Sequence, residues 1–145
     1  MGRRLYGKIS LAAVAILLGG AIYFFYRPDK AHFFSWIQST GLSSNLDHTR
    51  ANVQAYLFPI PDWIIYSIPD GLWAFGYALL ISSIWQYHKS PSRWIWMISI
   101  PVVTLGAEFI QLANTIPGTF CPVDMLFMIT GMVLGYFIGT YNLKS

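Results

Sequence analysis

The chain has 145 residues, of which 55% are hydrophobic and only 10% are charged. Soluble domains contain about 25% charged residues. This composition and the mean hydropathy of +0.50 therefore exclude an ordinary soluble protein and indicate an integral membrane protein. The formal net charge is only +3 and the sequence contains no basic run of the kind that binds nucleic acid, so we predict no nucleic-acid partner.

Four apolar runs predict four membrane-spanning helices in a single all-α transmembrane domain, residues 1–145. The expected spans are about 9–26, 71–87, 94–113 and 123–141. The first run would extend roughly 27 Å as a helix, close to the ~30 Å hydrocarbon core of a bilayer. A cleaved signal peptide is the alternative, but this run ends in aromatic residues followed by Arg27, not in small residues. We therefore predict a retained span and an integral membrane four-helix bundle.

Residues 27–70 contain no spanning run and are expected to form a long extracytoplasmic loop. Short apolar stretches at 31–39 and 50–58 predict helices that lie at the bilayer interface. A fold of this loop over the mouth of the bundle would suit the same composition. Pro69 and Asp70 are residue types of a helix N-terminus, which places the start of the second span here.

Lysine and arginine residues set the expected orientation, because they concentrate on the cytoplasmic side of membrane proteins. Four spans place both termini on one side, together with the loop between the second and third spans. That side carries Arg3, Arg4, Lys8, Lys89, Arg93 and Lys144, against Arg27, Lys30 and Arg50 on the other. We therefore predict a multi-pass protein of the cytoplasmic membrane with both termini in the cytoplasm.

The last third of the chain carries acidic and amide side chains within apolar helices. Glu108 and Gln111 share one helix face with Thr104 and Thr115, because successive members of the set are three or four residues apart. Asp124 lies at the start of the next span, and the topology brings it to the same outer end. An ionised side chain at the bilayer centre costs ~2.5–3.5 kcal/mol, so these acids need water, a cation or a hydrogen-bonding partner.

These residues form the expected ligand-binding site, to which Asp70 and Trp73 are added from the start of the second span. We predict that Glu108, Gln111 and Asp124 surround one outer cavity with Asp70 at its rim. The alternative is structural: a neutral Glu108 that bonds Gln111, a neighbouring threonine or a backbone carbonyl and ties two helices together. Oxygen ligands alone would suit Mg²⁺ or Ca²⁺, but the spacing matches no metal-binding motif, so we expect no metal and no cofactor.

Gly131, Gly135 and Gly139 follow one another at intervals of four residues along the fourth span. Glycine at this spacing lets a neighbouring helix approach closely, and we expect that neighbour to be the third span.

A set of residues between 106 and 139 resembles the signature of the VanZ-like family of small multi-span bacterial membrane proteins. The residues are Glu108, Gln111, Pro117, Gly118, Phe120, Asp124, Gly131 and Gly135. The founding member of that family is associated with resistance to the glycopeptide teicoplanin. Two positions differ: Gly118 stands where the family usually has arginine, and Met128 where it often has asparagine. The family's counter-ion is therefore absent from this stretch, and Arg27 or Arg50 is the alternative source of one.

The resemblance implies a protein of the cell envelope that binds a lipid, a cell-wall precursor or a glycopeptide-type ligand at an outer acidic pocket. The alternative is a small transporter or membrane enzyme that uses Glu108 and Asp124 as proton or cation ligands. The sequence has no Gly-x-Ser-x-Gly motif and no phosphate-binding glycine loop, so catalysis is left open but not favoured. Expected partners are membrane lipids and such an envelope ligand. Oligomerisation is left open, because transport by four spans would require it.

Overall fold

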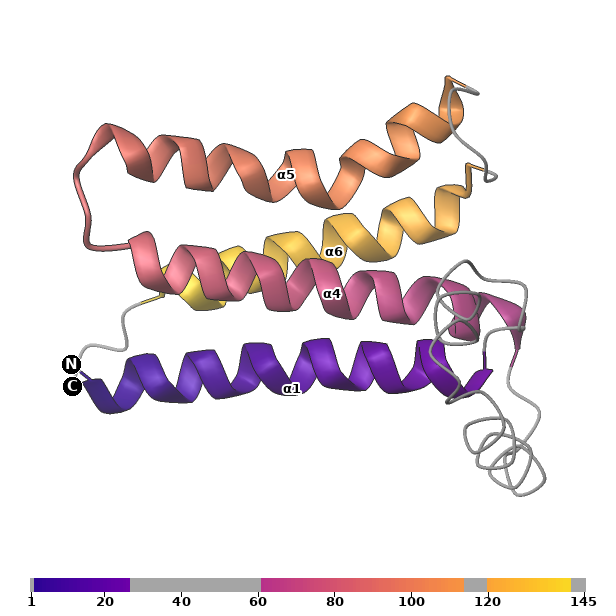
Figure 1. The fold of residues 1–145 in the computed structure, drawn as a ribbon, viewed down its shortest axis with the longest axis horizontal. Helices are drawn as coiled ribbons and strands as arrows, with labels where there is room; N and C mark the ends of the chain where they lie inside the picture. The colour runs from indigo at the N-terminus through magenta and orange to yellow at the C-terminus, as the bar shows by residue number, and fades with distance from the viewer. Residues whose placement is uncertain (1, 27–60, 114–119, 142–145) are drawn as a thin grey trace, which may run out of the picture.

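The structure is a computed structural model that describes residues 2–26, 61–113 and 120–141. Within these ranges the chain forms helices and short connections, without strands. The helices are α1 (Gly2–Tyr26), α4 (Asp62–Trp85), α5 (Pro91–Leu112) and α6 (Pro122–Thr140). Figure 1 shows them lying side by side, with α1 and α5 on opposite sides of the α4/α6 pair. The prediction of an all-α fold is confirmed for this part of the chain.

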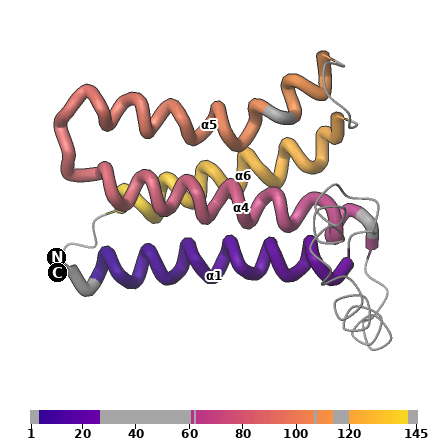
Figure 2. Tube along the Cα trace, in the orientation of Figure 1, coloured from indigo at the N-terminus to yellow at the C-terminus, as the bar shows by residue number. Residues whose placement is uncertain are grey.

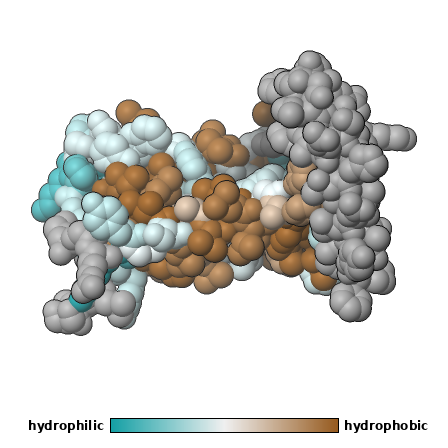
Figure 3. All heavy atoms as spheres, turned by 60° about the horizontal axis from the view of Figure 1, so that its bottom comes forward, coloured by the Kyte–Doolittle hydropathy of each residue, from teal (hydrophilic) through white to brown (hydrophobic). Residues whose placement is uncertain are grey.

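Three of these helices are long and apolar enough to cross a membrane, over residues 4–26, 63–85 and 122–140. Figure 3 shows the matching surface: apolar side chains form a band across the middle of the visible face, and hydrophilic residues gather toward one end. Helix α5 has 22 residues and is therefore roughly 33 Å long. The three apolar helices support the prediction of a membrane protein, whereas a bundle of four spans stays a prediction.

Helix α4 begins earlier than predicted, because Pro69 lies inside the helix and does not start it. The helix starts at Asp62, so residues 62–70 do not belong to the outer loop as expected. A proline removes one backbone hydrogen bond, but helices packed around it in a membrane protein can tolerate that loss. Pro69 is almost completely buried, and Asp70 consequently lies in the helix interior and not in a first turn. Residues 27–60, with the expected interfacial helices, lie outside the described residues.

The glycine seam of α6 packs against α4, and the prediction that it meets the third span, α5, is wrong. A Cβ atom at Gly131 would overlap the backbone carbonyl of Gly71, and one at Gly135 would overlap that of Phe75. Gly139 continues the seam one turn further. The backbones of α4 and α6 therefore touch along three turns, which only glycine permits. This is the most extensive contact between any two of the described helices.

Helix α1 packs on the other side of α4 through small residues. A Cβ at Gly76 would meet Ile16 and the backbone of Ala12, and one at Gly19 would meet Trp73. The lysine ammonium of Lys8 donates hydrogen bonds to the last carbonyls of α6, at 2.8 Å to Gly139 and 3.2 Å to Tyr141. The start of α1 is thereby held beside the end of α6, at the same end of the molecule as the α4–α5 connection (Figures 1 and 2).

Helix α5 is packed more lightly than the other helices. Near the α4–α5 connection it meets α4 in a small apolar cluster that includes Ile81 and Ile100. The hydroxyls of Tyr77 and Ser99 share a hydrogen bond of 2.8 Å beside it. Pro101 lies inside α5, and a proline inside a helix commonly bends it. Figure 1 shows α5 bending and separating from α4 toward the end of the molecule that carries the α5–α6 connection.

Candidate functional site

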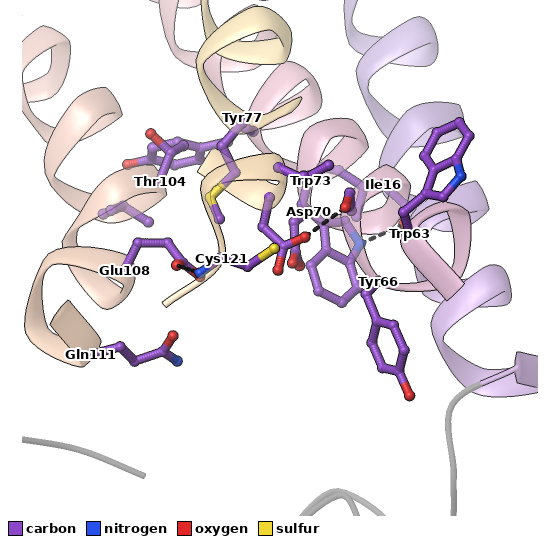
Figure 4. Close-up of a pocket in the computed structure, with 16 residues that line it drawn as sticks. Ile16, Trp63, Tyr66, Asp70, Trp73, Tyr77, Thr104, Glu108, Gln111 and Cys121 are labelled. Carbon is purple, nitrogen blue, oxygen red and sulfur yellow. Dashed lines mark hydrogen bonds between the residues drawn. The ribbon is translucent and has the colours of Figure 1, made fainter. Parts of the chain in front are cut away.

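The space between the separated ends of α4 and α5 is a cavity of about 960 Å³, closed on a third side by α6. This volume lies at the upper end of the range for small-molecule sites, ~300–1,000 Å³. Residues of all four described helices line it: Ile16, Trp63, Tyr66, Ser67, Asp70, Trp73, Ala74, Tyr77, Val103, Thr104, Glu108, Gln111, Cys121, Val123, Asp124 and Met128. Ten of the lining residues are labelled in Figure 4.

All five residues that the sequence indicated as a site line this one cavity. Asp70 and Trp73 come from α4, Glu108 and Gln111 from α5, and Asp124 from α6. Residues up to 54 positions apart in the chain (70 to 124) are therefore gathered around one space. Thr104, which shares the predicted polar face of α5, also lines the cavity, whereas Thr115 lies outside the described residues.

Glu108 is held at the junction of α5 and α6. Only 6% of its surface is exposed, and its Oε2 accepts a hydrogen bond of 3.3 Å from the backbone N–H of Cys121. Cys121 is the N-cap residue of α6, where backbone N–H groups lack partners within the helix and the helix dipole favours negative charge. The interhelical contact expected of Glu108 thus exists, but its partner is a backbone N–H and neither Gln111 nor a threonine. Thr104 donates instead to the carbonyl of Ile100, at 2.7 Å.

Asp124 is held by the opposite wall. It lies in the first turn of α6, and its Oδ1 accepts a hydrogen bond of 2.6 Å from the hydroxyl of Ser67 on α4. Ser67 is 1% exposed. A buried hydroxyl bonded to a carboxylate fixes the direction of the carboxylate, and charge-assisted bonds of this type are stronger than neutral ones. Both acids are therefore acceptors at fixed positions, one on each side of the start of α6.

Trp73 forms the boundary between the cavity and α1. Its indole N–H donates a hydrogen bond of 3.1 Å to the carbonyl of Ile16, drawn as a dashed line in Figure 4. Its ring also lies 5.4 Å from the ring of Tyr23, centroid to centroid. Trp73 thus lines the cavity and holds α1 against α4 at the same time.

Sequence reasoning missed an aromatic wall and two polar contacts. Trp63, Tyr66 and Tyr77 lie on the cavity face of α4 together with Asp70 and Trp73. The spacing of three or four residues between successive members is the signal that could have revealed this face. The hydrogen bonds that Ser67 and Cys121 donate had no such signal in the sequence. Each joins residues far apart in the chain, and helical spacing does not predict such pairs.

The chemistry of the described lining is that of hydrogen-bond acceptors and aromatic faces. It contains three carboxyl groups and one amide, and neither lysine, arginine nor histidine is among the described residues that line it. Nor does any trio of histidine, cysteine, aspartate or glutamate within the described ranges have the arrangement of a metal site. Comparison of the chain with protein-family models, with curated proteins and with solved structures gave no match.

Proposed function

We propose that the chain is a multi-span membrane protein of the bacterial cell envelope, similar to the VanZ-like family, and that it binds an amphiphilic ligand in the acidic cavity. The ligand classes are a lipid, a lipid-linked cell-wall precursor or a lipid-tailed glycopeptide. The observation that supports this most directly is the cavity itself. Five residues chosen from the sequence come from three helices and line one space of about 960 Å³.

The composition of the cavity favours an amphiphile over a small polar solute. Its walls combine tryptophan, tyrosine, valine, isoleucine and methionine with a few acids and an amide, which is the usual make-up of a site for a largely apolar ligand with one polar group. Three of the four described helices that enclose it, α1, α4 and α6, are long and apolar enough to cross a bilayer. A ligand already dissolved in the membrane could therefore reach this site without crossing water.

We place the cavity on the outer side of the cytoplasmic membrane, with α5 as the third of four spans. The support is the distribution of charge. Arg4, Lys8, Lys89 and Arg93 lie at the end of the molecule opposite the cavity, and basic residues concentrate on the cytoplasmic side.

The test is a bacterial host that expresses the wild-type chain, Glu108→Gln or Lys89→Gln, exposed to a glycopeptide with a lipid tail and to one without. We expect the wild type and Lys89→Gln to shift the sensitivity of the host to the lipid-tailed compound alone, and Glu108→Gln to abolish the shift while it accumulates in the membrane normally. Glu108→Gln is nearly isosteric and keeps an oxygen acceptor for Cys121. A second assay measures binding of the lipid-tailed compound to the purified protein by tryptophan fluorescence. The same assay can be applied to ligands that do not affect growth of the host. A full response from Glu108→Gln in both assays would leave Glu108 as a tie between helices only.

A further inference from the structure

The cavity is polar at one end and apolar at the other. Glu108 and Gln111 lie toward the end of α5 that leads to the α5–α6 connection, Asp124 lies in the first turn of α6, and Tyr77 lies deeper in the bundle. Tyr77 is seven residues beyond Asp70 on α4, which corresponds to about 10 Å along the helix. A ligand bound along this axis would have its polar group at the acidic end and its chain directed toward the middle of the bundle.

The deep end of the cavity is open toward the side of the bundle. Ile16 of α1 and Val103 of α5 line it and are nevertheless 38% and 61% exposed, so the cavity wall at these two residues is not covered by other described parts of the chain. In a bilayer these exposed side chains would face lipid chains. An alkyl chain can therefore leave the cavity sideways, and the length of that chain does not limit what binds.

At the polar end, the carboxyl groups of Glu108 and Asp124 are the hydrogen-bond acceptors on which the inference rests. Glu108 is more than nine-tenths buried, and its Oε2 accepts one long hydrogen bond of 3.3 Å from the backbone N–H of Cys121. Asp124 accepts one bond from Ser67, which leaves further lone pairs, because an ionised carboxylate can accept about four bonds. The aromatic side chains of Trp63, Tyr66 and Trp73 also line the cavity.

Two kinds of group recognise an ammonium ion. Carboxylates attract its charge and accept its hydrogen bonds, and aromatic rings bind it through the cation–π interaction. An anionic head group would instead be placed beside the carboxyl groups of Glu108 and Asp124, and like charges at close range are unfavourable. We propose that the cavity selects amphiphiles whose head group carries a positively charged ammonium, held between Glu108 and Asp124, with the alkyl chain passing Tyr77 and leaving between α1 and α5. This inference rests on the proposed function, because it names the head group of the ligand bound at that same site.

Cys121 gives a direct readout, since it lines the cavity and is the only cysteine in the sequence. The wild-type protein is placed in phosphatidylcholine nanodiscs, and the rate of its reaction with N-ethylmaleimide is measured against increasing dodecylamine, dodecyl maltoside or dodecanoate. These three probes share a twelve-carbon chain and differ in head-group charge. Tryptophan quenching by the same three amphiphiles with a brominated chain is a second readout that needs no access to the thiol.

We expect dodecylamine to protect Cys121 at a concentration at least about tenfold lower than the other two, the factor that corresponds to one well-formed charge contact. Glu108→Gln and Asp124→Asn should each remove most of this preference, and Lys89→Gln should keep it. A Cys121→Ser, Ser92→Cys protein reports at the far end of the molecule, and its labelling should respond equally to all three probes.

The outcomes separate the two proposals. Equal protection by the three probes, or stronger protection by dodecanoate, would overturn the ammonium preference while the cavity remains a binding site for amphiphiles. An absence of protection and of quenching by all three would overturn the proposed binding function itself. If Glu108→Gln does not fold, the comparison of the three probes on the wild-type protein still decides the question.

Discussion

Substitution of Gly135 by alanine tests the packing of α4 against α6. The added methyl would overlap the backbone carbonyl oxygen of Phe75, and it would lie 3.0 Å from the amide nitrogen of Leu79 and 3.1 Å from the Cβ of Ala78. Two of these three atoms belong to the backbone and cannot rotate away, so the helices must separate. A gap of 0.5–1 Å already removes roughly a quarter to a half of the dispersion energy of each contact across it.

The expected free-energy change follows from two opposing effects. Overpacking a tight interface costs about 1–3 kcal/mol, and alanine in place of glycine stabilises a helix by up to about 1 kcal/mol. Gly135→Ala should therefore lower the free energy of unfolding by about 1–2 kcal/mol, and Gly135→Leu by more, because its larger side chain forces a wider separation.

Unfolding by sodium dodecyl sulfate in mixed micelles measures this difference. The matched control is Gly20→Ala on α1, where the added Cβ would have no atom within 4 Å. That variant should be as stable as the wild type, or more stable by up to about 1 kcal/mol. If Gly135→Ala were as stable as Gly20→Ala, the backbones of α4 and α6 would not be in contact and the packing described above would be wrong.

Three further predictions concern the arrangement of the helices. Trp73→Phe removes the indole hydrogen bond to α1, and we expect a loss of about 0.5–1.5 kcal/mol together with faster amide exchange in α1; unchanged exchange would show that this bond does not hold the helix. Lys8→Met removes the donor to the last carbonyls of α6 and should cost about 0.3–1 kcal/mol in the same detergent titration, whereas Lys8→Arg should restore most of the loss. In a Cys121→Ser background, Ser92→Cys should react with an impermeant maleimide only after the cells are opened, and labelling of intact cells would reverse the proposed orientation.

The sequence was sufficient to predict that Glu108, Gln111 and Asp124 lie around one cavity, but not how they are held. Glu108 and Gln111 lie on one face of α5 because helical periodicity requires it, and Asp124 lies at the same end because α6 begins where α5 ends. The bond from Cys121 to Glu108 and the bond from Ser67 to Asp124 connect residues of different helices or helix ends. No local sequence pattern encodes which turn of one helix meets which turn of another.

The errors in the fold have the same physical origin. The glycine spacing identified a seam, but a smooth helix face can receive any neighbour, and the choice of α4 over α5 depends on the complementary backbone surface at Gly71 and Phe75. The start of α4 was misplaced because proline is most often a helix N-terminal residue. Inside a membrane protein, neighbouring helices can compensate for the missing hydrogen bond, and Pro69 is buried among them.

The two walls of the cavity should differ in how freely they can change over evolutionary time. Along the α4/α6 seam a larger side chain at one position requires a displacement of the opposite backbone, which no single substitution on the other helix can supply, so these glycines should be nearly invariant among relatives. The half of α5 beyond Pro101 touches its neighbours at few points, and its outward residues, such as Val102 and Phe109, are more than half exposed. That wall can exchange residues one at a time. Related chains that bind different ligands should therefore differ mainly in α5 while they share the same α4/α6 pair.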